Sequence, residues 1–429
     1  MSRPNGARPR AVIVVTGSEL VRGEHADLNG PFLARSLLEL GLEPVRIHVV
    51  GDDVEELEAA VRDAVADADL VATSGGLGPT HDDRTVEVVA RVAGLPLRVD
   101  AGLVGEIEAV SRMVAERMKR PYGDFSQGVT KQATVPEPST ILGLAGTAPG
   151  LVVEADGTPV IVLPGPPPEL QRLWPKALDA PLVARILAGG TRPLRRTLRL
   201  FGVGESQVAR AFQEAGGDGD GLEATICARS FEVHIDLVAE PRAESRLGAL
   251  EAALEERLGR HLYSRDGESV EELVLDRCRE LGWTIGTAES CTGGLVAGAL
   301  TAIPGSSDAV VGGVVAYADE VKVDALGVPR SLLEEHGAVS AEVAEAMARG
   351  LRERLGVDVA VSITGVAGPG GGSDEKPVGL VYYHVETPVA SHGSSFSFPG
   401  DRDSIRRRSV VASLHLVRRL LEQNRDKAV

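Results

Sequence analysis

The 429-residue sequence contains few cysteines and no long apolar run, and each absence excludes a class of protein. Its three cysteines, Cys227, Cys278 and Cys291, form no CxxC pair, which argues against a disulfide framework or a thiolate zinc site and favours the cytoplasm. The longest uncharged stretch, 291–307, is interrupted by Gly, Thr, Ser and Pro, so we expect no membrane span. The apolar run 11–15 is too short for the core of a signal peptide.

Positive charge is also scarce. The chain has 62 acidic and 45 basic residues, and its formal net charge of -17 repels polyanions and argues against nucleic acid as a partner. Aromatic residues make up only 3%, whereas 43% of the chain is hydrophobic and 50 residues are glycine, a composition typical of an ordered globular protein rich in turns. At roughly 150 residues per domain, the length predicts about three domains.

The hydrophobic pattern predicts two α/β domains with a smaller module between them. Up to about residue 170, short β-branched runs alternate with amphipathic helical segments, the pattern of a parallel sheet covered by helices. One clear helix starts after Asp53, which is spaced from Glu56 as in a capping box. The sequence RTLRLFGVG then begins a small α+β module, and alternation resumes from about Glu268.

Two loops near the N-terminus carry groups suited to phosphate and a hard cation. The sequence SGGLGPTHDD offers glycines whose amides can approach a phosphate, a hydroxyl donor and two acids, namely Gly75, Gly76, Gly78, Thr80, Asp82 and Asp83. A second loop holds Glu19, Asp27 and Asn29, and we expect it at the same sheet edge. Hydrolysis of a phosphoanhydride needs Mg²⁺ or Mn²⁺ held by such oxygen ligands. The alternative is that the acids cap helices and the glycines only turn the chain.

The C-terminal third carries a candidate nucleophile. In TAESCTGG, Ser290 lies between a predicted strand and a helix, where amides around Thr292, Gly293 and Gly294 can hold an oxyanion. No histidine stands in triad order, so Lys322, with Tyr317 nearby, is the expected base. Further loops supply Thr364 and a phosphate-binding arginine, Arg402. Each group has a structural alternative, such as a helix cap or a solvated charge, and Cys291 is a rival nucleophile.

These motifs resemble a known family. The sequences TGSEL, DLN and GGLGPTHDD resemble the molybdopterin-binding fold, and VIVLPGPPPEL with TVPEPSTILGLAGTAPG narrows the resemblance to the CinA family. The resemblance implies a three-layer α/β/α domain at 9–171, a KH-like α+β module at 172–262 and an α/β deamidase domain at 268–425. For the first domain it implies a metal-dependent ADP-ribose pyrophosphatase.

The C-terminal motifs AESCTGG, GGVVAY, TGVAGPGGG and GDRD resemble the PncC-type nicotinamide mononucleotide deamidase. That resemblance implies that Ser290 is the nucleophile, Lys322 the base, Tyr317 and Thr364 assisting hydroxyls and Arg402 the substrate anchor, with no metal required. We therefore expect a bifunctional hydrolase of pyridine-nucleotide breakdown products, acting on nicotinamide mononucleotide and ADP-ribose, and a homodimer. The alternative is a molybdopterin-binding or competence-associated binding protein in which one or neither site is active.

Overall fold

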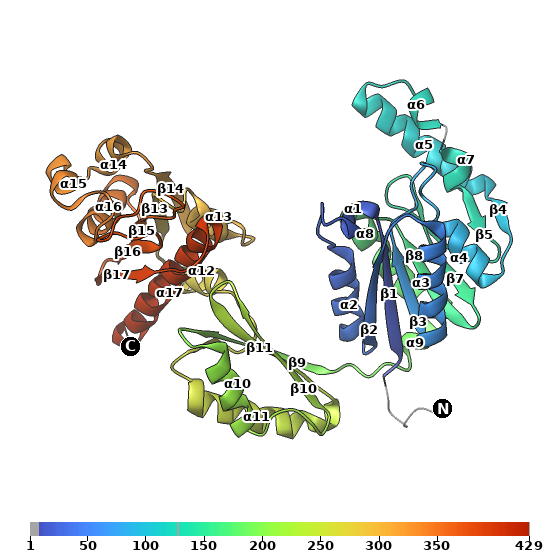
Figure 1. Cartoon of the computed structure of the whole chain (residues 1–429), viewed down its shortest axis with the longest axis horizontal. Helices are drawn as coiled ribbons and strands as arrows, with labels where there is room; N and C mark the ends of the chain where they lie inside the picture. The colour runs from blue at the N-terminus through green and yellow to red at the C-terminus, as the bar shows by residue number, and fades with distance from the viewer. Residues whose placement is uncertain (1–7, 127, 429) are drawn as a thin grey trace. The chain divides into compact units, whose positions relative to one another are not determined.

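The chain divides into two units between Leu194 and Arg195 in the computed structural model, which describes residues 8–126 and 128–428 (Figure 1). The elements of the first unit are β1 (Arg10–Thr16), α1 (Ser18–Val21), α2 (Asn29–Glu39), β2 (Glu43–Val50), α3 (Val54–Asp67), β3 (Leu70–Ser74), α4 (Thr85–Ala93), β4 (Leu97–Val99), α5 (Ala101–Met118), α6 (Gly123–Ser126), α7 (Val129–Gln132), β5 (Thr134–Pro136), β6 (Thr140–Leu144), β7 (Pro149–Ala155), β8 (Thr158–Leu163), α8 (Pro167–Asp179) and α9 (Pro181–Leu187).

The first unit is a six-stranded sheet between two layers of helices. Its strand order is β2-β1-β3-β8-β7-β6, with β2, β1, β3 and β8 parallel. In β1, Val12 and Val14 face the layer that contains α3 and α4, whereas Ile13 and Val15 face α2, α8 and α9. Burial on both faces explains the continuous apolar run of this strand. The predicted three-layer α/β/α arrangement is confirmed.

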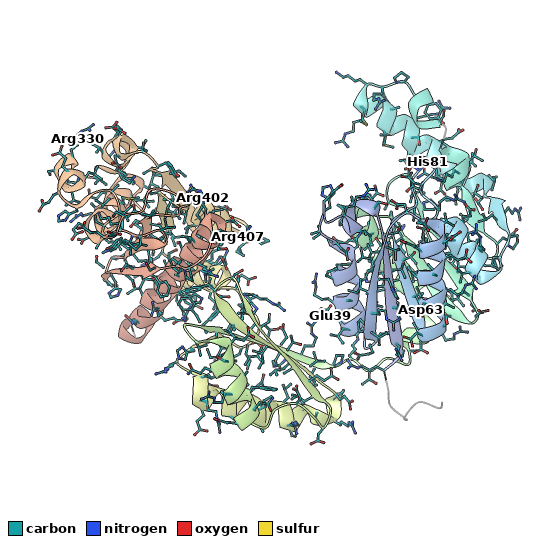
Figure 2. The ribbon with its side chains drawn as sticks, in the orientation of Figure 1. Glu39, Asp63, His81, Arg330, Arg402 and Arg407 are labelled. Carbon is teal, nitrogen blue, oxygen red and sulfur yellow. The ribbon has the colours of Figure 1, made fainter. Side chains whose placement is uncertain are left out.

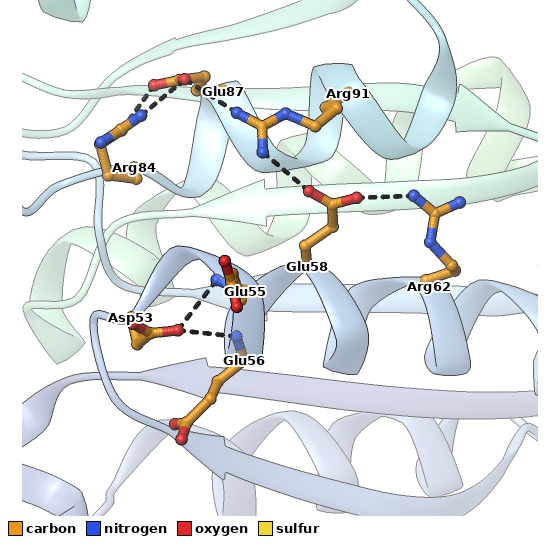
Figure 3. A network of polar contacts seen from close by, with 8 residues as sticks. All are labelled: Asp53, Glu55, Glu56, Glu58, Arg62, Arg84, Glu87 and Arg91. Atoms are coloured by element: carbon orange, nitrogen blue, oxygen red, sulfur yellow. Dashed lines mark hydrogen bonds and ion pairs between the residues drawn. The ribbon is translucent and has the colours of Figure 1, made fainter.

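Charged side chains join the two helices of one outer layer. Asp53 caps α3 as predicted, accepting hydrogen bonds from the amides of Glu55 and Glu56. Across the surface, Arg91 of α4 contacts both Glu58 of α3 and Glu87 of its own helix (Figure 3). These exposed pairs contribute little each, because water screens them.

The predicted start of the middle module at residue 172 is wrong. Helices α8 and α9 pack on the first sheet through Trp174, Ala177 and Val183, all buried in its core. The first unit therefore continues to Leu194, because these apolar residues cover a sheet face that would otherwise be exposed to water.

The second unit contains two sheets. Its elements are β9 (Leu194–Phe201), α10 (Glu205–Glu214), β10 (Leu222–Arg229), β11 (Glu232–Ala239), a 3₁₀ turn (Pro241–Ala243), α11 (Glu244–Leu258), β12 (Leu262–Ser264), α12 (Val270–Leu281), β13 (Ile285–Glu289), α13 (Leu295–Thr301), a 3₁₀ turn (Ser306–Asp308), β14 (Val310–Val315), α14 (Asp319–Leu326), α15 (Arg330–His336), α16 (Ala341–Leu355), β15 (Val359–Gly365), β16 (Leu380–Glu386), β17 (Ser391–Ser397) and α17 (Arg402–Ala428).

The smaller sheet has the order β10-β11-β9-β12 and carries α10 and α11, as the predicted α+β module requires. The larger sheet has the order β14-β13-β15-β16-β17, in which β14, β13 and β15 are parallel. Helices α12, α13 and α17 pack on one face of the larger sheet, and α14, α15 and α16 on the other. No helix within residues 8–126 and 128–428 has the length and apolar character needed to cross a membrane.

A buried polar cluster joins the two sheets of the second unit. His415 of α17 is fully buried, stacks on Phe201 at 3.8 Å between ring centroids, and lies 2.7 Å from a carboxylate oxygen of Glu232. Burial lowers the pKa of His415 to about 4, so the ring is neutral at pH 7 and donates its Nε2 proton to Glu232. The other oxygen of Glu232 lies 3.2 Å from His234.

Candidate functional site

Three candidate side chains follow the ends of neighbouring parallel strands in the larger sheet of the second unit. Ser290 comes directly after β13, Tyr317 shortly after β14, and Thr364 lies near the end of β15. The last residue of β13, Glu289, pairs with the ends of both neighbours. Because adjacent strands are about 4.8 Å apart, these residues lie along one edge of the sheet.

Lys322 extends this edge from the following helix. Its side chain is 1% exposed, and Nζ lies 3.3 Å from the carbonyl oxygen of Tyr317 and 3.3 Å from Oδ1 of Asp319. Arg402, the first residue of α17, donates a 2.8 Å hydrogen bond to the Tyr317 hydroxyl and another of 2.8 Å to the carbonyl of Gly368. The structure thus links Lys322, Tyr317 and Arg402 through direct contacts.

Among the described residues, Thr364 and Ser290 form no hydrogen bond with this group of linked residues. The Thr364 hydroxyl donates to the carbonyl of Ala338 at 2.7 Å. Ser290 is 9% exposed, and in the described part of the chain no hydrogen bond joins its Oγ to Lys322, whose Nζ is held by the Tyr317 carbonyl and Asp319. The dyad is therefore not closed, although its members share one edge of the sheet.

The expected oxyanion donors are largely occupied. The buried carboxylate of Glu289 accepts hydrogen bonds from the amides of Gly294, Val296 and Ala297 at 2.8 to 3.0 Å. The amide of Gly293 donates to the carbonyl of Ser290 at 3.1 Å. The assignment of Gly293 and Gly294 as free amide donors is therefore corrected, because the loop uses both amides to hold its own shape.

Sequence reasoning missed this role of Glu289, and it missed Arg406 as well. Arg406 donates from Nε to the carbonyl of Cys291 at 3.1 Å and from Nη2 to the carbonyl of Thr292 at 2.7 Å. A run of three arginines at 406–408 indicates a solvated helix face, yet this one reaches the loop after Ser290. The loop after Ser290 is therefore fixed from two sides: Glu289 accepts hydrogen bonds from its amides, and Arg406 donates hydrogen bonds to its carbonyls.

The remaining two residues of the loop are buried. Burial raises the pKa of the Cys291 thiol to about 12, so the thiolate is scarce at neutral pH and Cys291 is poorly suited to act as the nucleophile. Thr292 is 0% exposed, and its hydroxyl has no hydrogen-bond partner among the described residues. An unpaired buried hydroxyl is costly, and a ligand can satisfy the one of Thr292 only where the loop uncovers it.

In the first unit, the glycine loop follows β3 as predicted. Gly75 has a φ of +102°, and a Cβ there would lie 2.4 Å from the carbonyl oxygen of Thr16, so only glycine fits. Gly76, Gly78 and Asp83 line a cavity of about 150 Å³ together with Lys131. This volume suits a phosphate group, whereas whole-nucleotide pockets measure roughly 300 Å³ or more.

Asn29 connects the loop that holds Glu19, Asp27 and Asn29 with the end of β3, directly before the glycine loop. Its Nδ2 donates to the hydroxyl of Ser74 at 2.9 Å and to the carbonyl of Gly165 at 2.6 Å, while its buried Oδ1 has no partner among the described residues. Asp27 accepts the amides of Asn29 and Gly30, so it caps α2.

The four acids predicted to bind a metal are not gathered. Asp83 accepts hydrogen bonds from the amide and hydroxyl of Thr80, Asp27 caps α2, and Asp82 is exposed. Glu19 lies in the short helix α1. Within residues 8–126 and 128–428, no three His, Cys, Asp or Glu side chains are placed to hold a metal ion. As arranged here, these carboxylates do not fit Mg²⁺ or Mn²⁺, and their role as ligands stays a prediction.

Comparisons with known proteins match the chain in three segments. Residues 12–184 match the probable molybdopterin binding domain, 195–264 the damage-inducible protein CinA KH domain and 267–421 the CinA C-terminal domain. A CinA-like protein of Mycolicibacterium paratuberculosis is 46% identical over 96% of this chain and 98% of its own length. One from Mycobacterium marinum is 44% identical over 96% of this chain and 99% of its own.

A solved structure, the competence/damage inducible protein CihA of Agrobacterium tumefaciens, is 42% identical to the segment it matches. It covers 36% of this chain and 95% of its own, with a TM-score of 0.35.

Proposed function

This chain belongs to the CinA family, and from that premise we propose that its C-terminal domain hydrolyses the carboxamide of nicotinamide mononucleotide to nicotinate mononucleotide and ammonia. The observation that carries the proposal is Lys322, a side chain 1% exposed that lies at the same strand edge as Ser290. Lysine is almost never fully buried unless it is paired, and Nζ of Lys322 is held here by Asp319 and the Tyr317 carbonyl. A desolvated amine at the edge of the sheet that carries the serine suits base catalysis.

In the proposed mechanism, the neutral amine of Lys322 accepts the Ser290 proton while Oγ attacks the carboxamide carbon. The tetrahedral intermediate collapses, the nitrogen leaves with the transferred proton as ammonia, and an ester of Ser290 remains. Water then hydrolyses this ester to the carboxylate and frees the serine. The positive charge of the substrate pyridinium disfavours a protonated amine nearby and makes the carbonyl more electrophilic.

The donor for the oxyanion must be a group of the loop that has no hydrogen-bond partner within the protein. Because the amides of Gly293 and Gly294 are engaged, we assign this role to the Thr292 hydroxyl, which has no partner among the described residues. Replacing Thr292 by Ala should lower kcat by about 10², and Thr292→Ser should restore most of it.

Arg402 is proposed to bind the 5′-phosphate. A guanidinium has five N–H donors, and the bonds to Tyr317 and Gly368 occupy only two of them. The same two bonds fix the direction of the side chain, so little conformational freedom is lost when a phosphate binds.

The proposal is tested by steady-state kinetics on nicotinamide mononucleotide in EDTA, measuring both ammonia and the acid product. Lys322→Ala should abolish turnover, whereas Arg402→Ala should mainly raise KM, because the phosphate is remote from the bond that breaks. Arg330→Ala, an exposed arginine on α15, is the matched control. Wild-type protein that releases no ammonia would refute the deamidase, and full activity of Lys322→Ala would refute the assigned base.

For the first unit we propose cleavage of ADP-ribose at its diphosphate. Support comes from the small cavity along the glycine loop, with Lys131 in its wall, and from the unpaired buried oxygen of Asn29 nearby. The amides of Gly76 and Gly78 would approach one phosphate, and Thr80 would add a hydroxyl. No step is assigned to a metal, because the acids are not arranged around one.

The test is release of AMP and ribose 5-phosphate from ADP-ribose, with Asn29→Ala and with molybdopterin as a competing ligand. Loss of hydrolysis in Asn29→Ala supports the proposal. Tight molybdopterin binding without any hydrolysis would favour the alternative of a binding protein.

A further inference from the structure

A large cavity lies in the second unit, away from the residues assigned to catalysis. Its volume is about 740 Å³, within the range of ligand pockets, which is roughly 300–1,000 Å³. Four segments form its wall: the loop from β9 into α10, the turn between β10 and β11, β17, and the first turns of α17. We call it the inter-module cavity, because the smaller sheet and the C-terminal domain both line it.

Two arginines give the inter-module cavity a cationic side. Arg407 is 71% exposed, and among the described residues it forms a 2.8 Å pair with Asp403 on its own helix, a kind of pair that water readily screens. Its neighbour Arg408 donates to the carbonyl of Pro399. Figure 2 places Arg407 on α17, close to Arg402. In a chain with a net charge of -17, two adjacent guanidinium groups in a cavity wall favour an anion.

The acids in the same wall are already engaged. Glu205 accepts a 2.9 Å hydrogen bond from the amide of Ala228. Glu232 is bound by His234 and His415 and is only 6% exposed. Neither carboxylate pairs with the two arginines, so within the described part of the chain the one acid that a phosphate must displace from Arg407 is Asp403 on its own helix.

Aromatic side chains make another part of the cavity wall apolar. Phe396 is 46% exposed, which is unusual for so large an apolar group, and its ring centroid lies 5.6 Å from that of Phe231. The guanidinium carbon of Arg408 lies 6.0 Å from the centre of the Phe231 ring. An exposed ring next to guanidinium groups suits a planar base attached to a phosphate.

The turn that carries Phe231 is strained. β10 ends at Arg229 and β11 begins at Glu232, so Ser230 and Phe231 alone make the turn, with φ of 50° and 73°. Such turns normally use Asn or Gly, because a bulky side chain at positive φ clashes with its own backbone. Strain of this kind persists where the surroundings enforce it, and here it places an aromatic ring in the cavity wall.

Helix α17 connects this cavity with the proposed catalytic edge. Arg402 and Arg406 reach Tyr317 and the loop after Ser290. At 100° per residue, Ser404 and Arg408 lie on the opposite side of the same two turns, in the wall of the cavity. A ligand held there would act on the side of the helix that positions the catalytic loop.

We propose that the inter-module cavity is a second nucleotide site of the second unit, beside the proposed catalytic one, and that it takes a nucleoside monophosphate with its phosphate on Arg407 and Arg408 and its base against Phe396. Occupancy changes the turnover at Ser290 through α17. The binding step stands by itself, whereas the effect on turnover rests on the proposed deamidase function.

The test is isothermal titration of the full chain with AMP, with adenosine and inorganic phosphate as separate probes. AMP should bind more tightly than either fragment. Arg407→Glu should weaken the AMP affinity by at least about 10-fold, because it replaces a charge-assisted contact by repulsion. Arg330→Glu makes the same charge change on α15 and should leave the affinity unchanged. Because Arg407 is exposed, thermal unfolding should match that of the wild type.

Absence of AMP binding, or equal affinities in the Arg407 and Arg330 variants, would overturn the proposal, since AMP would then occupy no site or only another one. Turnover of nicotinamide mononucleotide with and without AMP is measured in parallel. If the wild type has no deamidase activity, the proposed function fails while the titration still decides the second site. If turnover is present and AMP binds but leaves it unchanged, the regulatory part is overturned.

Discussion

Removing the Glu289 carboxylate should destabilise the C-terminal domain strongly. Its side chain is 1% exposed and holds three backbone amides, those of Gly294, Val296 and Ala297. Helix α13 has only seven residues and no other side-chain cap at its start. Glu289→Ala would therefore leave three amides without an acceptor in a buried loop.

The expected magnitude follows from the number of amides. Each buried donor left unpaired costs about 1–3 kcal/mol, and relief of the buried charge offsets part of the sum, so we expect a loss of about 3–5 kcal/mol. Glu289→Gln retains one carbonyl acceptor and places an NH₂ group against an amide, so its loss should be intermediate. Glu320→Ala, at an exposed position on α14, should change the stability by less than about 0.5 kcal/mol.

The assay is urea unfolding of the full chain, followed by hydrogen exchange of peptides from β13 and α17. These peptides report the C-terminal domain separately from the first unit. A change for Glu289→Ala as small as that for Glu320→Ala would refute the reasoning, because the three hydrogen bonds would then contribute nothing measurable.

Three further predictions follow from packing, titration and metal dependence. Gly350→Ala should lower the free energy of unfolding in urea by about 1–3 kcal/mol, because its Cβ would lie 1.7 Å from the Leu326 carbonyl oxygen. Gly298→Ala has open space around it and should raise the free energy of unfolding by about 0.5–1 kcal/mol. Because the pKa of His415 falls from 6.5 to about 4 on burial, the unfolded chain binds more protons between these values. Unfolding free energy should therefore drop by about 2 kcal/mol from pH 7 to pH 5, and His415→Phe should flatten this dependence. EDTA should leave ammonia release intact, and it should abolish ADP-ribose cleavage if a divalent ion is required; cleavage that persists in EDTA would contradict the predicted metal.

Periodicity and motif order predicted the layered architecture, because strands buried on both faces and amphipathic helices leave strong local signals. They also placed Ser290, Tyr317 and Thr364 at or just after the ends of strands, and the structure shows that these strands are neighbours in one sheet; that the three side chains form one site was implied only by the family resemblance. The boundary predicted at residue 172 was wrong, because the amphipathic pattern of α8 and α9 does not show which sheet they cover.

The residues that hold the catalytic loop could not be found in the same way. Glu289 stands at the end of a strand, where an acid usually points to solvent, and only the fold shows that it turns onto the start of α13. Arg406 contacts carbonyls that are 114 and 115 positions away along the chain. The one local signal is that α13 begins after glycines and has no cap residue of its own. Its first amides must therefore find a hydrogen-bond acceptor elsewhere in the chain.

The nucleophile is the central claim, and two adjacent residues allow it to be tested directly. Ammonia release from nicotinamide mononucleotide should be measured for Ser290→Ala beside Cys291→Ala. We expect Ser290→Ala to lose about 10³-fold or more in kcat, and Cys291→Ala to remain within a few-fold of the wild type, because burial raises the pKa of that thiol to about 12. The reverse result, with Ser290→Ala active and Cys291→Ala inactive, would contradict the serine mechanism.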